Sequence, residues 1–382
     1  PRQCGKTTLL RKIFEIVGGE FISFEDKTAL NMFNKDIENF IKLYVNGKKF
    51  LFIDEFQYAK QGGKKLKYIY DFNKIKIFIS GSSAIDLTVN ALKFLVGRIF
   101  IFNMHTLSFE EFLGFKNESL GKMWAEENEK FKRLEAVEVK PDLHQKFLEY
   151  FDEYMIFGGY PRVVLADRVE EKKEVLKNIY NTYFLREVRD ILGLIDDYKL
   201  GKLIRGLALQ IGNLIEYSEL GQLAEYSHVT LKKYMNFLEK PFICSFLNPY
   251  FKNRRVEIVK NPKVYFFDTG LRNSIVNDFR GVEERGDAGA LLENAVFQEL
   301  VKGGFDFNYW RDKKQHEVDF VIHLEGQKKI ALEVKTYLKI DGVDMSALKN
   351  IHPEMVSAVA FRNKNEKMES PKNVLFYPVY VV

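Results

Sequence analysis

The chain has 382 residues, of which 46% are hydrophobic and 29% charged, a balance typical of globular proteins with room for about two to four domains. A net charge of +5 is too small to indicate a nucleic-acid partner by itself, so the local distribution of charge decides that question. The two cysteines, Cys4 and Cys244, lack metal-ligand spacing, which argues against a disulfide framework or a zinc site. We see no transmembrane run and no signal peptide, and therefore expect a cytoplasmic protein with no membrane partner.

The first part of the chain alternates helical patterns with short apolar runs. Residues 5–17 place apolar side chains at helical spacing and are followed by two glycines, and residues 36–46 predict a second helix. The apolar runs at 50–53 and 75–79 predict strands that end in polar residues. Helices alternating with continuously apolar strands favour a parallel sheet covered on both faces, so we predict an α/β fold.

The chain begins inside a phosphate-binding pattern. Residues 1–7 (PRQCGKT) match the end of the P-loop motif G-x-x-x-x-G-K-[ST], so its first glycine and the N-terminal strand are expected to precede the sequence. Backbone N–H groups of such a loop bind phosphates together with the start of the following helix. Gly5 leaves room for the phosphate, Lys6 is expected to reach the β- and γ-phosphates, and Thr7 offers its hydroxyl to Mg²⁺. The candidate ATP-binding residues here are Gly5, Lys6, Thr7 and Thr8.

A second motif, FLFIDE at residues 50–55, supports a nucleotide site. The apolar strand delivers two carboxylates at its carboxyl end, the edge at which parallel sheets bind ligands. Asp54 is expected to hold Mg²⁺, and Glu55 to polarise the attacking water as a general base. A Gly-Lys-Thr sequence can also open an ordinary helix, but the two motifs together favour ATP binding and hydrolysis.

Two further positions are candidates for contacts with the nucleotide. Ser82 lies in a Ser-Gly-Ser-Ser run at 80–83 that could sense the γ-phosphate, with a simple Gly/Ser turn as the alternative. Arg98 is a candidate arginine finger or internal phosphate sensor, with a solvated surface arginine as the alternative. Because a finger acts across a subunit interface, a homo-oligomer is a further expectation.

The rest of the chain is helical before strands take over. Residues 109–150 and a block that runs to about 195 are helical, and three short helical patterns follow over 199–240. One further helix is expected at 290–302. The predicted strands of this part are 242–247, 264–267, 307–310, 318–322, 330–334 and 374–377.

A series of short motifs runs along the whole chain. They are RQCGKTT (2–8), FIDEF (52–56), SGSSA (80–84), Gly97-Arg98, LSFEEF (107–112), GGYP (158–161), YFFDTGL (265–271), LEN (292–294), EVDF (317–320) and EVK (333–335). In this order they resemble a prokaryotic (archaeal or bacterial) family of AAA-type P-loop ATPases. The resemblance implies an ATPase core with a helical lid, a winged helix, and a small mixed α/β domain similar to restriction endonucleases and other PD-(D/E)xK nucleases. The domains expected from it are 1–140 (ATPase core), 141–197 (lid), 198–272 (winged helix) and 273–382 (nuclease-like).

The winged-helix segment offers a candidate DNA-binding surface. Residues 217–226 and 227–240 predict helix, turn and helix, with Ser227 capping the second helix. The stripe expected to be buried is Val229, Leu231, Tyr234, Met235 and Leu238, which leaves His228, Lys232, Lys233 and Asn236 for a DNA major groove. The basic residues expected at the wing, where they could neutralise phosphates, are Lys252, Arg254, Arg255, Lys260 and Lys263. A winged helix that binds protein, with solvated lysines, is the alternative.

Carboxylates in the last part of the chain form a candidate nuclease centre. Glu333 and Lys335 lie two residues apart on one strand and therefore project from the same face, and a hairpin would bring Asp319 beside Glu333. Asp319 and Glu333 can hold Mg²⁺, Glu293 can complete the metal shell, and Lys335 can orient or activate water. A Glu-x-Lys pair on a strand is common by itself. Glu317 is a lesser candidate, and Asp268 with Thr269 is expected to cap a helix.

The predicted function is therefore an ATP-binding and ATP-hydrolysing AAA-type protein that acts on DNA and carries a metal-dependent nuclease domain. Whether that domain cleaves stays open. Two alternatives remain: a nucleotide-driven regulatory switch that recruits proteins, and a DNA-binding regulator with an inactive nuclease-like domain.

Overall fold

The computed structural model describes residues 3–81, 94–184, 198–250, 261–324, 326, 328–338, 348, 354–364 and 374–382. The chain divides into two units, Pro1–Met104 and His105–Val382, each with its own hydrophobic core. The predicted domain boundary at 140 does not coincide with this division, because the first helices after residue 105 pack within the second unit. The finer division into four domains stays a prediction.

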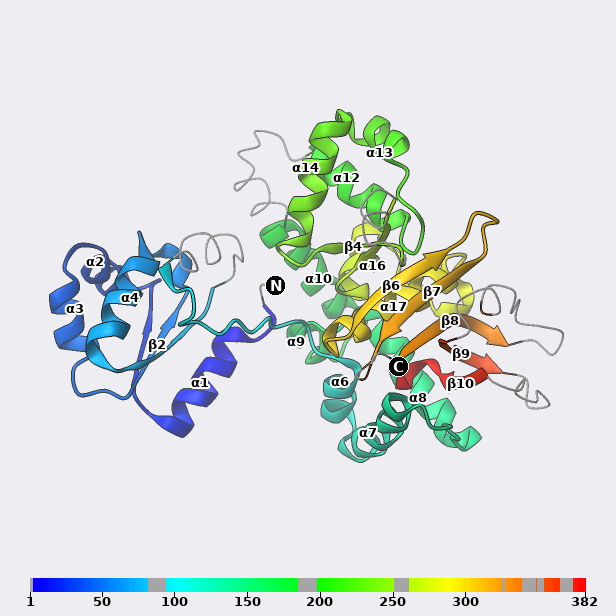
Figure 1. Cartoon of the computed structure of the whole chain (residues 1–382), viewed down its shortest axis with the longest axis horizontal. Coiled ribbons are helices and arrows are strands. Elements are labelled where there is room, and N and C mark those ends of the chain that lie inside the picture. Colours follow the sequence, from blue (N-terminus) through cyan, green and yellow to red (C-terminus); the bar gives the residue numbers. More distant parts are fainter. Residues whose placement is uncertain are drawn as a thin grey trace. The chain divides into compact units, whose positions relative to one another are not determined.

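The first unit is a parallel sheet with helices between its strands (Figure 1). Its elements are α1 (Lys6–Val17), β1 (Glu20–Ser23), α2 (Lys27–Lys35), α3 (Ile37–Tyr44), β2 (Phe50–Asp54), η1 (Phe56–Tyr58), α4 (Gly62–Asn73) and β3 (Lys76–Ile79). The order β1-β2-β3, with both pairs parallel, confirms the predicted parallel sheet and is compatible with a P-loop fold.

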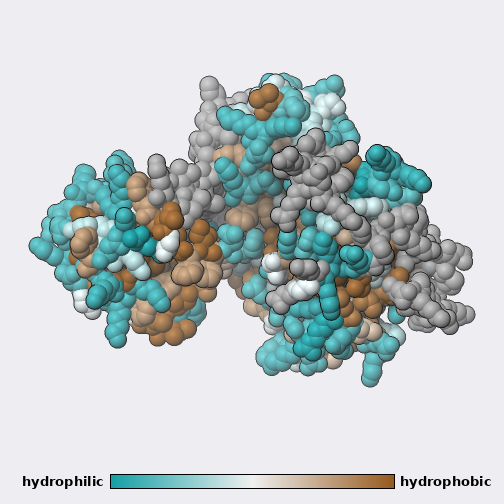
Figure 2. Space-filling model, viewed as in Figure 1, coloured by the Kyte–Doolittle hydropathy of each residue, from teal (hydrophilic) through white to brown (hydrophobic). Residues whose placement is uncertain are grey.

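Aromatic side chains cover both faces of this sheet. Phe33 lies in the core of one face, with ring centroids 5.0 Å from Phe24 and 5.1 Å from Phe40. On the opposite face, Phe52 stacks on Phe78 at 4.7 Å and meets Phe14 of α1 at 5.8 Å. Figure 2 shows apolar surface over this unit, where Leu9, Ile16 and Val17 of α1 are exposed. The central strand β2 is thus buried on both sides, which fixes the position of Asp54 at its end.

The second unit joins a group of helices to a five-stranded sheet. Its helices are α6 (Phe109–Lys116), α7 (Glu118–Arg133), α8 (Pro141–Phe157), α9 (Pro161–Val164), α10 (Val169–Asn178), the π-helical η3 (Ile179–Phe184), α12 (Tyr198–Leu209), α13 (Tyr217–Ala224), α14 (His228–Glu239), α16 (Thr269–Val276), η4 (Val282–Glu284), α17 (Ala288–Lys302) and η6 (Val379–Val381). Its strands are β4 (Cys244–Leu247), β5 (Lys263–Phe266), β6 (Asp306–Arg311), β7 (Glu317–His323), β8 (Lys329–Leu338), β9 (Val356–Lys364) and β10 (Val374–Pro378).

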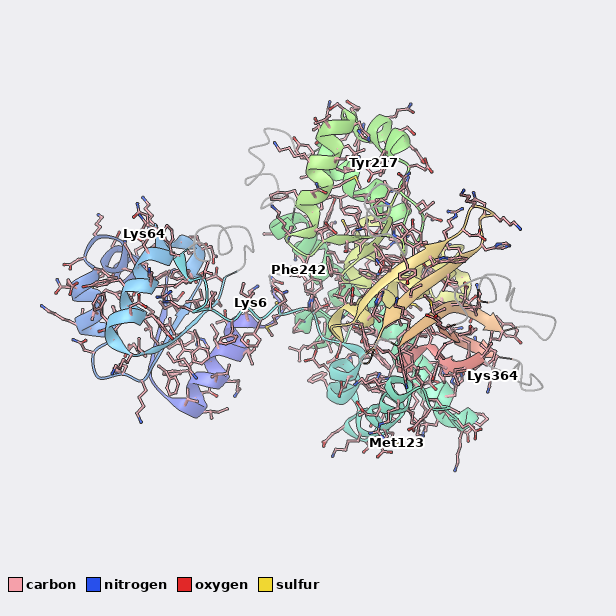
Figure 3. The ribbon with its side chains drawn as sticks, viewed as in Figure 1. Lys6, Lys64, Met123, Tyr217, Phe242 and Lys364 are labelled. Atoms are coloured by element: carbon pink, nitrogen blue, oxygen red, sulfur yellow. The ribbon has the colours of Figure 1, made fainter. Side chains whose placement is uncertain are left out.

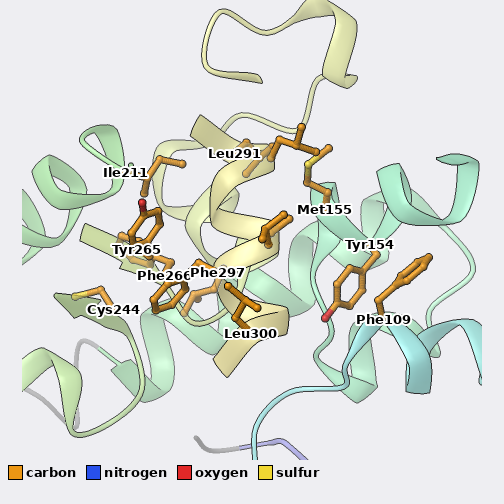
Figure 4. Close-up of a cluster of buried hydrophobic side chains, with 14 of the residues drawn as sticks. Phe109, Tyr154, Met155, Ile211, Cys244, Tyr265, Phe266, Leu291, Phe297 and Leu300 are labelled. Atoms are coloured by element: carbon orange, nitrogen blue, oxygen red, sulfur yellow. The ribbon is translucent and has the colours of Figure 1, made fainter. Parts of the chain in front are cut away.

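The strand order of the larger sheet is β10-β9-β8-β7-β6. The pairs β6–β7 and β7–β8 are antiparallel, whereas β8–β9 and β9–β10 are parallel. Helix α17 packs on this sheet, and side chains from α6, α8, β4, β5 and α17 meet in one buried cluster (Figure 4). Strands β4 and β5 form a separate antiparallel pair.

The two glycines of the GGYP motif allow close contacts inside this unit. A Cβ on Gly159 would lie 2.2 Å from the Leu107 carbonyl oxygen, and a Cβ on Gly158 would lie 2.0 Å from Asp268 Oδ1. Asp268 accepts hydrogen bonds from the backbone N–H of Gly159 at 2.9 Å and of Leu271, in the first turn of α16, at 2.9 Å. The prediction that Asp268 caps a helix is therefore confirmed. No helix in the described ranges is long and apolar enough to cross a membrane.

Candidate functional site

Helix α1 begins directly at the predicted P-loop. Its N-cap, Gly5, has φ +96°, a left-handed conformation that favours glycine, and the first turn carries no acidic residue. Lys6 stands at this end of the helix (Figure 3), and its Nζ lies 3.9 Å from the sulfur of the buried Cys4. Backbone N–H groups and a positive side chain thus stand together at this end of α1, the combination that binds phosphate at a helix start.

The structure brings the hydroxyl of Thr7 to the carboxylate of Asp54. Thr7 Oγ1 donates to Asp54 Oδ2 at 2.7 Å, although 47 residues separate the two in sequence. Ser80, at the end of β3, donates to the other carboxylate oxygen of Asp54. The strand ends are fixed as well, because Ser80 N bonds to the Ile53 carbonyl at 3.0 Å. A hydroxyl and a carboxylate held side by side are hard oxygen donors that suit Mg²⁺.

The remaining residues predicted for the nucleotide site are Glu55, Arg98, Thr8 and Ser82. Glu55 adopts a left-handed backbone conformation with φ 53°, and its carboxylate accepts a hydrogen bond from Gln57 Nε2. Arg98 is exposed, with its Nε 3.1 Å from Asp71 Oδ1, and its role at the nucleotide stays a prediction. Thr8 is exposed at the start of α1, and Ser82 lies outside the described residues.

In the second unit, the predicted carboxylates meet where two strands diverge. The β7–β8 ladder ends at the pair Phe320 and Leu332, so that Asp319 and Glu333 are the next residues on the two strands. Asp319 Oδ2 accepts from the Val334 N–H at 2.8 Å. Lys335 Nζ lies 2.7 Å from Glu333 Oε2, as expected for residues on one face of a strand. We call Glu293, Glu317, Asp319, Glu333 and Lys335 the acidic centre.

A residue that we did not predict for this site lies at its middle. Lys263, the first residue of β5, is 1% exposed, and its Nζ lies 2.9 Å from Glu293 Oε1 and 2.6 Å from Glu317 Oε1. A third carboxylate, that of Asp319, is 3.8 Å away. The predicted place of Lys263 among the phosphate-binding residues of a wing is therefore wrong, since a lysine buried in ion pairs cannot reach DNA. The other four basic residues of that group lie outside the described residues.

Two glutamates of the acidic centre, Glu293 and Glu333, have raised pKa values. Burial, followed by the charge of Asp319, raises the pKa of Glu293 to about 7 and that of Glu333 to about 8. Tyr265 donates its hydroxyl to Glu293. Burial opposes a charged Lys263, but the surrounding oxygen atoms, those of Tyr265 and Glu293 foremost, raise its pKa well above the ordinary value.

These residues do not fit a prearranged metal site. Among the residues for which the structure gives positions, no group of three or more His, Cys, Asp or Glu side chains could hold a metal ion. The predicted ligands Glu293, Asp319 and Glu333 do not form such a group, and the ammonium of Lys263 lies 2.9 Å from Glu293 and 3.8 Å from Asp319. Two of the predicted ligands thus neutralise a lysine instead.

The residues predicted for the exposed face of α14 lie on the surface, and most of those predicted to be buried are buried. His228, Lys232, Lys233 and Asn236 are at least partly free of the core, while Leu231 and Leu238 are buried. Val229, predicted to be buried, is 79% exposed, because the helix begins at His228 and its first turn projects beyond the core. Lys232 lies over the ring of Tyr217, 5.1 Å from its centroid (Tyr217 is labelled in Figure 3).

Three family models match successive parts of the chain. Residues 1–113 match an AAA domain. Residues 148–281 and 288–381 match two domains of unknown function, DUF8612 and DUF4143. The first match and the Thr7–Asp54 contact agree, since AAA domains bind nucleotides and AAA proteins are typically ATPases.

Similar proteins occur in archaea and bacteria. An uncharacterized protein of Methanocaldococcus jannaschii is 27% identical over 91% of this chain and 80% of its own length. An uncharacterized protein of Haemophilus influenzae is 25% identical over 90% of each chain. An uncharacterized protein of Mycobacterium tuberculosis is 26% identical over 46% of this chain and 41% of its own length. The combination of domains thus recurs in distant prokaryotes.

Proposed function

We propose that the protein binds and hydrolyses ATP in its first unit, and that the nucleotide controls how the second unit engages DNA. The observation that carries the ATPase part is the contact between Thr7 and Asp54, which joins the two halves of a nucleotide site at the carboxyl ends of parallel strands. The match of residues 1–113 to an AAA domain supports the same part.

Each residue of this site has a distinct role in the proposal. Lys6 binds the terminal phosphates, while Thr7 and Asp54 would hold Mg²⁺, which neutralises charge on the phosphate oxygens when bound. Ser80 orients the Asp54 carboxylate through its hydrogen bond. Glu55 takes a proton from the attacking water, for which its carboxylate has to turn away from Gln57.

The proposal that the second unit engages DNA rests on the order of its helices and strands over residues 198–266 and on the exposed face of α14. The helices α12, α13 and α14 are followed by the antiparallel pair β4–β5, the order of elements in a winged helix. The face of α14 that carries Lys232, Lys233 and Asn236 is polar and exposed, as a helix in a major groove requires. DNA binding is therefore the interaction that this segment supports best.

The observations favour the alternative in which the acidic centre does not cleave DNA. Cleavage by such a centre needs carboxylates that bind a divalent metal. Here Glu293 and Asp319 face the ammonium of Lys263. We therefore propose a DNA-binding regulator driven by ATP rather than a nuclease.

Fluorescence anisotropy of a labelled DNA duplex tests this proposal. We expect affinity that falls steeply with salt and differs between the ATP-bound and ADP-bound protein. The double substitution Lys232→Ala and Lys233→Ala should lower the slope of log K against log salt by about 0.9 for each phosphate that is no longer neutralised. The matched control is Lys122→Ala with Lys132→Ala, on another exposed helix of the same unit. An equal decrease in both double variants, or no DNA binding, would contradict the proposal and favour a protein-recruiting switch.

A further inference from the structure

We propose that Lys263 is a built-in cation of the acidic centre, which takes the place of a divalent metal ion and keeps the centre closed to metal. The inference concerns the second unit alone and does not depend on ATP hydrolysis or on DNA binding. It predicts that removal of one positive charge, rather than addition of a ligand, creates a metal site in this protein.

The contacts of Lys263 account for its three ammonium protons. Two of them can serve Glu293 at 2.9 Å and Glu317 at 2.6 Å, and the third faces Asp319 at 3.8 Å. These residues come from α17 and β7, so the ammonium ties a helix to the sheet. A lysine at 1% exposure has left water entirely, and only such close carboxylates can stabilise its charge.

The backbone around Lys263 holds this side chain in place. Lys263 pairs with Leu247 in the β4–β5 ladder, and Ile215 N bonds to the carbonyl of Pro262 at 3.0 Å. Tyr309 donates its hydroxyl to the Asn261 carbonyl at 2.7 Å, and its ring lies 5.7 Å from the Lys263 ammonium. Contacts of both its backbone and its side chain therefore hold the ammonium of Lys263 within the centre.

A divalent metal and this ammonium cannot share the centre. Oxygen ligands bind such metals at about 2.0–2.6 Å, so a metal on Glu293 and Asp319 would lie in contact with the ammonium and be repelled by it. Without the ammonium, the carboxylates of Glu293, Glu317 and Asp319, each with an oxygen atom within 3.8 Å of its position, have the chemistry that Mg²⁺ and Mn²⁺ prefer. The lysine therefore occupies the position that a metal ion on these carboxylates would need.

The test is a Mn²⁺ titration of the full chain, followed by electron paramagnetic resonance of free Mn²⁺. All proteins carry Asp54→Asn, so that the nucleotide site contributes nothing. Lys263→Met removes the charge and keeps much of the volume, and Lys263→Arg keeps the charge. We expect Lys263→Met to bind one Mn²⁺ at least about tenfold more tightly than the parent and the arginine variant do. Adding Asp319→Asn to Lys263→Met should abolish the gain.

Two results obtained with folded protein would overturn the inference, and a third applies if Lys263→Met does not fold. The first is that the parent protein itself binds Mn²⁺ and that Asp319→Asn abolishes this binding. This result does not depend on whether a lysine variant folds. The other is a folded Lys263→Met protein, judged by circular dichroism, that binds Mn²⁺ no better than the parent. If Lys263→Met does not fold without metal, recovery of its circular dichroism and thermal transition by Mn²⁺ supports the inference, and failure of Mn²⁺ to restore them contradicts it.

Discussion

Replacing Glu333 by Gln should make the second unit more stable in alkaline solution. The Glu333 side chain is 4% exposed, and its pKa is raised to about 8, first by burial and then by Asp319. A raised pKa in the folded state means that folding favours the protonated form. The stability from this group is fully present below the ordinary pKa of glutamate, about 4.5, and is lost as pH rises through about 8.

The size of the effect follows from the same pKa values. One pKa unit corresponds to about 1.36 kcal/mol, so the rise of the Glu333 pKa to about 8 sets an upper limit of roughly 5 kcal/mol. Because Glu333 titrates together with Asp319 and Lys335, we expect its ionisation to lower the free energy of unfolding by about 2–4 kcal/mol at pH 9. A neutral amide at this position avoids this cost. For a unit of this size that difference raises the melting temperature by roughly 5–15 °C.

Thermal unfolding followed by circular dichroism at pH 4.5 and pH 9 measures the effect. We expect Glu333→Gln to melt close to the wild type at pH 4.5 and well above it at pH 9. The control is Glu138→Gln, at an exposed position of the same unit, which should melt like the wild type at both values. A Glu333→Gln protein that is less stable than the wild type at pH 9, or equally shifted at both values, would refute the reasoning.

Two further predictions concern the backbone of the second unit and the exposed arginine of the first. Gly159→Ala would place a Cβ 2.2 Å from the Leu107 carbonyl oxygen. We therefore expect this substitution to lower the free energy of unfolding, measured in urea, by about 3 kcal/mol or more. The control is Gly201→Ala, which has open space around the new Cβ and should leave the stability unchanged. Mixing Arg98→Ala with Glu55→Gln subunits should restore ATPase activity if the arginine acts in trans; full activity of Arg98→Ala alone would leave it a surface residue paired with Asp71.

Elements with a strong local pattern could be predicted from the sequence. The apolar runs at 50–53 and 75–79 became β2 and β3, and the predicted helices at 5–17 and 290–302 became α1 and α17. Strand β1, with four residues, is too short for a clear period. Strand β9 was not predicted, although the apolar residues at its centre, 358–361, lie between Pro353 and the polar stretch 362–367.

For the candidate sites too, prediction from the sequence succeeds where a local motif is strong and fails where tertiary packing decides. Thr7 and Asp54 could be paired in advance because the P-loop chemistry requires a hydroxyl and a carboxylate at set places. Lys263 could not be placed, since it stands in a basic stretch of sequence while its partners Glu293 and Asp319 follow much later in the chain. Local charge indicates a surface, and only tertiary packing makes such a lysine internal. The unbroken apolar run after Lys263 was the one signal that could have placed it in a buried strand.

The most direct test of the ATPase site compares ATP binding with ATP turnover in the full-length protein. A fluorescent ATP analogue measures binding, and phosphate release measures hydrolysis. Lys6→Ala should weaken both, because it removes a contact to the phosphates. Glu55→Gln should bind ATP like the wild type but hydrolyse it about 10²–10⁴-fold more slowly, because the general base is gone. Normal hydrolysis by Glu55→Gln, or unchanged ATP binding by Lys6→Ala, would contradict the account.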